Sequence, residues 1–199
     1  MTPTVDGDVL AVLAATADNP FTTGQLHRML SHYSEAGIRK VLQRLSKQGT
    51  VLASKIGNAY VYRLNPDHLG YEHIVGLAGI FNEFLRRVER ELSTWPAAPV
   101  YAAIFGSAAR GTMTVDSDID IFLVRSDTAP VDDWDGQVTD LLSAITKWTG
   151  NDARDLQFTE SEITRHRNDE PVLDDIASEG VTVAGSRSHF IRTLRRESA

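Results

Sequence analysis

Hydrophobic residues recur at helical spacing in three stretches near the start of the chain. The first stretch covers residues 7–18. The second begins at Thr22 or Thr23, either of which can cap the N-terminus of a helix. The third begins after Ser34 and ends at Gly49, a residue type that commonly terminates helices. These patterns predict three short helices, each with one apolar face.

The next two hydrophobic runs alternate with polar residues, as β-strands do. They cover residues 51–55 and 59–64, and the intervening Ile56-Gly57-Asn58 predicts a tight hairpin. The order helix, helix, turn, helix, hairpin resembles a winged helix-turn-helix domain. This resemblance implies that residues 34–48 form the recognition helix and that residues 55–60 form the wing.

Basic residues in this region bear on the choice of partner. A recognition helix lies in the major groove, where its basic side chains contact phosphates and base edges. The resemblance therefore implies that DNA is a partner and is contacted by Arg39, Lys40, Arg44 and Lys55. The alternative is that these side chains form a solvated helix face and that the domain mediates protein contacts.

A longer amphipathic pattern follows over residues 71–94 and stops at Trp95-Pro96. It predicts one long helix, which we interpret as a connector that packs on a second domain. The same apolar stripe could instead form the seam of a homodimer.

The segment from Val100 to Arg125 contains the candidate chemistry. Its first six residues are apolar and predict a strand that is buried on both faces. Gly106-Ser107 follows at the predicted start of a helix, where free backbone N–H groups and the helix dipole favour anions. We therefore expect Gly106 and Ser107 to hold phosphates, with Arg110 neutralising part of their charge.

Two aspartates begin the next predicted strand. Side chains alternate along a strand, so Asp118 and Asp120 share one face, and Phe122 and Val124 continue it. Neighbouring carboxylates repel unless a cation neutralises them, and paired hard oxygens suit Mg²⁺. The pattern predicts a metal site at the edge of the sheet, and we expect Asp116 to add to the negative field there rather than to bind the metal.

The sequence Gly-Ser-Ala-Ala-Arg-Gly, followed by Ser-Asp-Ile-Asp-Ile, resembles the minimal nucleotidyltransferases of the DNA polymerase β-like superfamily. The resemblance implies that Gly106 and Ser107 hold the nucleotide phosphates. It also implies that Asp118 and Asp120 are catalytic and bind the metal, with two Mg²⁺ ions expected and Mn²⁺ as an alternative.

This family usually adds a third carboxylate on a later strand. The predicted strand at residues 153–159 offers Asp155, which we expect to complete the catalytic site. Gln157 is the alternative occupant of this position, and the chain would then lack the family's third carboxylate.

The remaining patterns define the domains. An amphipathic helix is expected over residues 132–147, a short strand over 181–184 and a C-terminal helix over 186–197. The predicted fold class is α+β or mixed α/β. A winged helix domain at 1–68 precedes a nucleotidyltransferase domain at 69–199, with a mixed sheet flanked by helices.

Charge supports this division. The 199 residues carry a net charge of -7, but residues 1–68 hold seven bases and five acids, which gives them a net charge of +2. The acidity therefore lies in the second domain, and it does not exclude nucleic acid as a partner of the first. The chain has no cysteine, no apolar run long enough for a membrane span and an acidic N-terminal segment, so we expect a cytoplasmic protein.

These observations predict a metal-dependent enzyme that moves a nucleoside monophosphate from an NTP, with ATP as the first choice, to a hydroxyl. The acceptor could be a protein, an RNA or a small molecule. The alternative is a DNA-binding regulator or toxin–antitoxin component whose nucleotidyltransferase domain only binds nucleotide or a partner.

Overall fold

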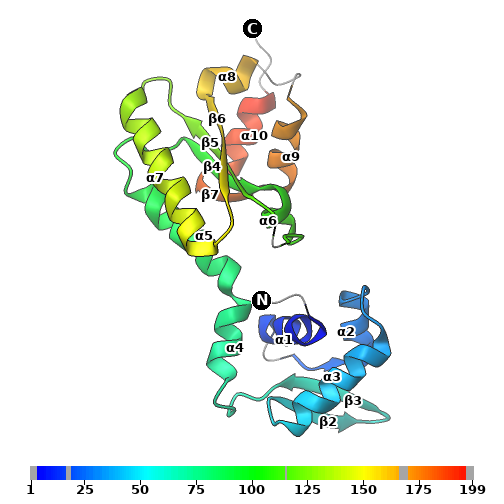
Figure 1. The fold of residues 1–199 in the computed structure, drawn as a ribbon. Coiled ribbons are helices and arrows are strands. Elements are labelled where there is room, and N and C mark those ends of the chain that lie inside the picture. The colour runs from blue at the N-terminus through cyan, green and yellow to red at the C-terminus, as the bar shows by residue number, and fades with distance from the viewer. Residues whose placement is uncertain (1–3, 17–18, 115, 166–169, 196–199) are drawn as a thin grey trace. The chain divides into compact units, whose positions relative to one another are not determined.

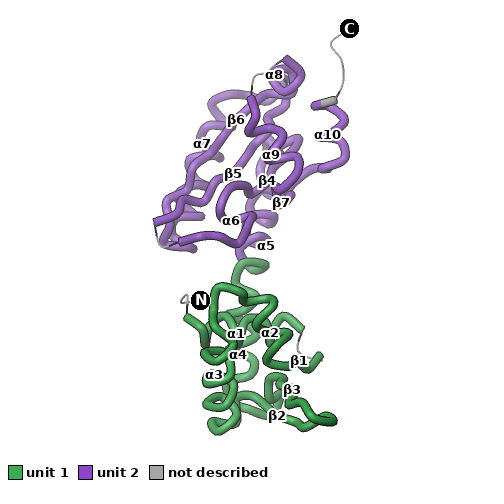
Figure 2. The backbone as a smooth tube through the Cα atoms, turned by 90° about the vertical axis from the view of Figure 1, so that its right-hand side faces the viewer, with its two compact units in different colours: residues 1–83 green, residues 84–199 purple. Residues whose placement is uncertain are grey.

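The computed structural model describes residues 4–16, 19–114, 116–165 and 170–195. The chain divides into two compact units, Met1–Glu83 and Phe84–Ala199 (Figure 2). Within the described ranges, no helix has the length and apolar character that a membrane span requires.

Unit 1, residues 1–83, combines helices with a small antiparallel sheet of order β1-β3-β2 (Figure 1). Its elements are α1 (Val5–Ala15), β1 (Phe21–Thr22), α2 (Thr23–Met29), α3 (Glu35–Lys47), β2 (Val51–Ile56), β3 (Ala59–Leu64) and α4 (Tyr71–Ala78). The helices and the hairpin have the order predicted from the sequence, and the two-residue strand β1 is added to them.

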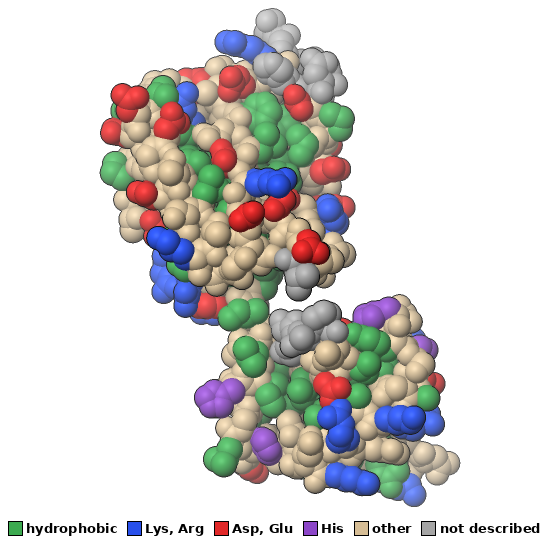
Figure 3. Space-filling view, in the orientation of Figure 1, with side chains coloured by type: hydrophobic (Ala, Val, Ile, Leu, Met, Phe, Trp, Pro, Cys, Tyr) green, Lys and Arg blue, Asp and Glu red, His purple; other side chains and the backbone are tan. Residues whose placement is uncertain are grey.

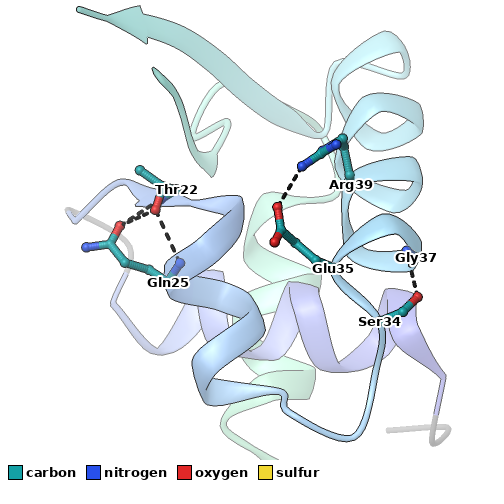
Figure 4. Close-up of polar contacts among 6 residues, drawn as sticks. All are labelled: Thr22, Gln25, Ser34, Glu35, Gly37 and Arg39. Atoms are coloured by element: carbon teal, nitrogen blue, oxygen red, sulfur yellow. Dashed lines mark hydrogen bonds and ion pairs between the residues drawn. The ribbon is translucent and has the colours of Figure 1, made fainter. Parts of the chain in front are cut away.

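Local capping explains where two of these helices begin (Figure 4). The hydroxyl of Thr22 accepts a hydrogen bond from the backbone N–H of Gln25, and the Gln25 side chain accepts one from the N–H of Thr22. This reciprocal pair is a capping box. At α3, the Ser34 hydroxyl accepts a hydrogen bond from the N–H of Gly37 at 3.1 Å, as its position before the apolar stripe predicts.

The single helix expected over residues 71–94 is in fact two helices, α4 and α5 (Ile80–Ser93), which are separated at Gly79. Gly76 and Gly79 are close together in the sequence at this break, and glycine is a poor helix former, so the two residues weaken the helix there. The first helix, α4, packs against α1 and the core of unit 1. The connector interpretation was therefore wrong for residues 71–78.

Unit 2, residues 84–199, is built on a four-stranded mixed sheet of order β6-β5-β4-β7. The pair β5–β6 is parallel, and the pairs β4–β5 and β4–β7 are antiparallel. After α5, the elements are β4 (Tyr101–Phe105), α6 (Gly106–Arg110), β5 (Ile119–Arg125), α7 (Val131–Thr149), β6 (Ala153–Thr159), α8 (Glu160–Arg165), α9 (Pro171–Glu179), β7 (Val181–Gly185) and α10 (Arg187–Arg195).

The two faces of this sheet have different coverings (Figure 1). On one face, Phe122 and Phe158 join a buried cluster with apolar residues of α8, α9 and α10. We call this the α9 face. On the other face, the indole N–H of Trp134 in α7 donates a 2.6 Å hydrogen bond to the side-chain oxygen of Gln157 in β6. We call this the α7 face.

Candidate functional site

Gly106 and Asp120 form the centre of the candidate site. Strand β4 pairs with β5 so that Phe105 lies opposite Asp120, which brings the start of α6 against the start of β5. Gly106 has a φ of +68°, and a Cβ atom on it would lie 2.5 Å from Oδ2 of Asp120. Only glycine therefore fits here without displacing the carboxylate.

Asp118 lies immediately before β5 and is paired with a base that the sequence did not single out. Nη1 of Arg154 lies 3.0 Å from Oδ2 of Asp118, and the two side chains are 70% and 27% exposed. Arg154 is opposite Asp120 in the parallel β5–β6 register, so its side chain belongs to the same face of the sheet. The α9 face thus carries Asp118, Asp120 and Arg154 at one end.

The pKa of Asp120 is raised above its usual range. Burial is the main cause, and the negative charge of Asp118 adds to it, while Arg154 and Arg110 act in the opposite direction. An ionised carboxylate with these neighbours is stabilised by an added cation.

Arg110, at the end of α6, also has an acidic partner. Its Nη1 lies 3.1 Å from Oε2 of Glu179 in α9, and both side chains are about half exposed. Ser107 is partly buried at the second position of α6. The first N–H groups of a helix have no partner within it. The structure therefore brings Gly106, Ser107 and Arg110 together with the Asp118–Asp120 pair.

Asp155 does not join this group. It is in register with Ile121, so it belongs to the α7 face, on the opposite side of the sheet from Asp120. Its Oδ2 accepts a 2.5 Å hydrogen bond from Nε2 of Gln157, which is itself held by Trp134. Asp155 therefore supplies no third carboxylate on the α9 face, and Gln157 shares the α7 face with it. Arg154 lies on the α9 face instead.

A sequence signal for Arg154 was present. In β5, Asp120 begins the row that continues as Phe122 and Val124, and in β6, Arg154 begins the row that continues as Leu156 and Phe158. The apolar members of both rows enter the same core cluster. Matching the two rows by their burial would have placed Arg154 beside Asp120.

The donors fit a divalent cation that is bound together with a ligand. Among the described residues, no group of three or more His, Cys, Asp or Glu side chains could hold a metal. Asp118 and Asp120 supply two carboxylates, and Asp116 is exposed on the loop before them. Mg²⁺ is usually bound through one or two carboxylates, with substrate phosphates and water completing its shell.

The four candidate DNA contacts in unit 1 differ in their present partners. Nη2 of Arg39 lies 2.6 Å from Oε1 of Glu35, one helical turn earlier (Figure 4). Arg44 is paired with Asp6 of α1. Lys40 in α3 and Lys55 in β2 are exposed. Basic side chains gather on the visible face of unit 1, and acids prevail on that of unit 2 (Figure 3).

One comparison with known proteins covers the candidate site. Residues 83–171 match the family model of the nucleotidyltransferase domain, and this range contains Gly106, Ser107, Asp118 and Asp120. No curated protein matches the chain significantly. The match places a nucleotidyltransferase domain in this part of the chain.

Several solved toxin–antitoxin structures resemble part of the chain. One contains AMP-PNP, with a TM-score of 0.41, 16% identity and coverage of 56% of this chain and 81% of that one. Another is a tri-AMPylated Shewanella oneidensis HEPN toxin in complex with MNT antitoxin, with a TM-score of 0.38, 13% identity and coverage of 57% and 80%. A third is MntA–HepT, with a TM-score of 0.37, 14% identity and the same coverage of 57% and 80%.

Proposed function

We propose that unit 2 transfers a nucleoside monophosphate from an NTP, preferentially ATP, to a hydroxyl of an acceptor, with Mg²⁺ or Mn²⁺ as the cation. The observation that carries this proposal is the close approach of the Asp120 carboxylate to the Cα of Gly106, which leaves no room for a Cβ atom. It brings a glycine backbone, which can approach a phosphate closely, against a carboxylate that favours a cation. The nucleotidyltransferase match at residues 83–171 supports the same reaction class.

In the proposed reaction, the acceptor oxygen forms a bond to the α-phosphorus of the NTP. The bond from that phosphorus to the bridging oxygen of the β-phosphate breaks, and pyrophosphate leaves. Backbone N–H groups at Gly106 and Ser107, together with Arg110, hold the phosphates, while Asp118 and Asp120 hold the cation. The cation, when bound, offsets the negative charge that develops on the phosphate oxygens.

The proton of the acceptor hydroxyl passes to solvent in this scheme. Asp155, the expected third carboxylate, belongs to the opposite face of the sheet. This arrangement also favours a second candidate function, in which the domain binds nucleotide or a partner without transferring the nucleotide. The protein would then act as a DNA-binding regulator or as one component of a toxin–antitoxin pair.

Label transfer separates the two functions. The purified chain is incubated with Mg²⁺, each α-³²P-labelled NTP in turn and a cell lysate as the source of acceptors. The enzyme should transfer label to a protein, RNA or small molecule, and Asp118→Ala/Asp120→Ala should not. Absence of transfer with every NTP, or equal transfer by the double variant, would refute the enzymatic function.

We also propose that unit 1 binds DNA as a winged helix, with α3 as its recognition helix and the β2–β3 hairpin as its wing. The exposed bases Lys40 and Lys55 and the order of the elements support this proposal. Arg39→Ala/Arg44→Ala should weaken binding to the protein's own promoter and reduce the salt dependence of binding. Arg28→Ala, in α2, is the control. If the double variant and wild type bind the promoter with equal affinity, α3 is not the recognition helix.

A further inference from the structure

Arg154 occupies the place where a third acid was expected, and it faces two proposed metal ligands. Its guanidinium lies 3.0 Å from Asp118, and its register position is opposite Asp120. Its charge also acts on Asp120, because it is one of two arginines that partly offset the rise in the pKa of that carboxyl. Arg154 therefore partly neutralises both carboxylates.

A cation bound by Asp118 and Asp120 would compete with this arginine. A carboxylate oxygen that coordinates a divalent ion has less negative charge to offer a guanidinium, and the two cations repel each other. Arg154 is 70% exposed, so its side chain can leave Asp118 at little energetic cost. Guanidinium groups bind phosphate oxygens in a fixed, often bidentate geometry.

We propose that Arg154 exchanges partners: it pairs with Asp118 in the nucleotide-free protein and binds the phosphates when the metal–nucleotide complex enters. This inference rests on the proposed function of the site and adds a phosphate-binding residue to it. Arg154 opposes binding of a bare divalent ion but favours binding of the ion with its nucleotide. The site therefore selects the complex over the free metal.

If Arg154 exchanges partners, Arg154→Ala should change the affinity for the metal alone and the affinity for the metal–nucleotide complex in opposite directions. Arg154→Ala should increase the affinity for Mn²⁺ alone by about two- to fivefold, which is the range of an exposed ion pair. The same variant should bind an ATP analogue with a methylene between its α- and β-phosphates about three- to tenfold more weakly in the presence of Mg²⁺. A residue with a purely structural role would not produce this divergence.

Two binding measurements on the full chain test the exchange. Electron paramagnetic resonance of free Mn²⁺ gives the metal affinity, and isothermal titration calorimetry gives the analogue affinity. Arg154→Lys keeps the charge and should stay closer to wild type than Arg154→Ala in both. Arg165→Ala is the matched control, because Arg165 ends α8 at the other end of β6 and is also exposed.

Any result for Arg154→Ala other than the divergence overturns the exchange. Unchanged affinities, or affinities that both fall or both rise, are such results. Asp118→Ala separates this failure from failure of the proposed function. If Asp118→Ala weakens both ligands while Arg154→Ala shows no divergence, only the exchange is wrong. If Asp118→Ala also binds both ligands like wild type, the proposed metal–nucleotide site is wrong as well.

Discussion

The first residue of α6, Gly106, and the residue that follows the helix, Gly111, provide a matched pair of substitutions. Gly106 and Gly111 both have a φ of +68°, and they differ in what an added Cβ would meet. At Gly106 the new atom would lie 2.5 Å from Oδ2 of Asp120, whereas at Gly111 nothing lies within 4 Å. Gly106→Ala and Gly111→Ala therefore both place an alanine at the same positive φ, and only the first disturbs the carboxylate.

The expected magnitudes follow from this difference. An alanine in the left-handed region costs roughly 1–2 kcal/mol, so both variants should lose about that much free energy of unfolding. Unit 2, residues 84–199, is somewhat larger than a 100-residue domain, so 1 kcal/mol lowers its melting temperature by roughly 3–5 °C. The Asp120 carboxylate is the end of a side chain that can rotate away, so the close contact should add less to the stability loss than to the loss of binding.

Thermal unfolding measures the loss of stability. Calorimetric titration with Mg²⁺ and the ATP analogue that has a methylene between its α- and β-phosphates measures the loss of affinity. We expect similar melting temperatures for the two variants but affinity at least about tenfold weaker for Gly106→Ala, which corresponds to about 1.4 kcal/mol. Gly111→Ala should retain affinity within about twofold of wild type. If Gly106→Ala binds as tightly as wild type, or if both variants lose affinity equally, the close approach of Gly106 to Asp120 does not position the site.

The other predictions concern single side chains. The pKa of Asp120 is raised in the folded protein, so the free energy of unfolding falls as the pH rises through that pKa. In urea unfolding, Asp120→Asn should therefore be more stable than wild type at pH 7. This difference in stability should disappear below about pH 4, where the aspartate is protonated in both states. Asp6→Asn removes the partner of Arg44 and should strengthen promoter binding in a mobility-shift titration, and weaker binding would contradict a contact between Arg44 and DNA. Ser34→Ala should cost about 1 kcal/mol of unfolding free energy through loss of the α3 cap, whereas exposed Ser31→Ala should cost almost none.

Capping residues and apolar periodicity located most of the elements in advance. Thr22 and Ser34 begin helices as expected, and the strand predicted at residues 153–159 matches β6. These features depend on interactions within a few residues, so one segment of sequence contains the information. The two-residue strand β1 was not predicted, because it is defined by its pairing with β3, which is distant in the sequence.

The identity of the side chain beside Asp120 could not be read from alternation alone. Alternation shows that Asp155 and Gln157 share a face, but it does not show which face of β6 matches which face of β5. A shift of one residue in register moves every side chain to the other side of the sheet. In the structure, Asp120 is in register with Arg154. This register packs Leu156 and Phe158 against the buried cluster on the α9 face, which explains why it forms.

The division of the helix expected over residues 71–94 has a different cause. Its apolar stripe continues through Gly79, so periodicity predicted one helix. The stripe is used in two places: Ile74 and Val75 of α4 pack against the core of unit 1, while Phe84 and Val88 of α5 are buried in unit 2. A continuous pattern therefore concealed a change of packing partner.

The most direct test of the account compares the two sides of the sheet. Calorimetric titration of the Mg²⁺–analogue complex into wild type, Asp120→Ala and Asp155→Ala shows which carboxylate belongs to the site. The geometry predicts that Asp120→Ala loses measurable binding and that Asp155→Ala, on the α7 face, binds within about twofold of wild type, a difference below about 0.5 kcal/mol. Loss of binding in Asp155→Ala equal to that in Asp120→Ala would contradict the assignment of the site to the α9 face.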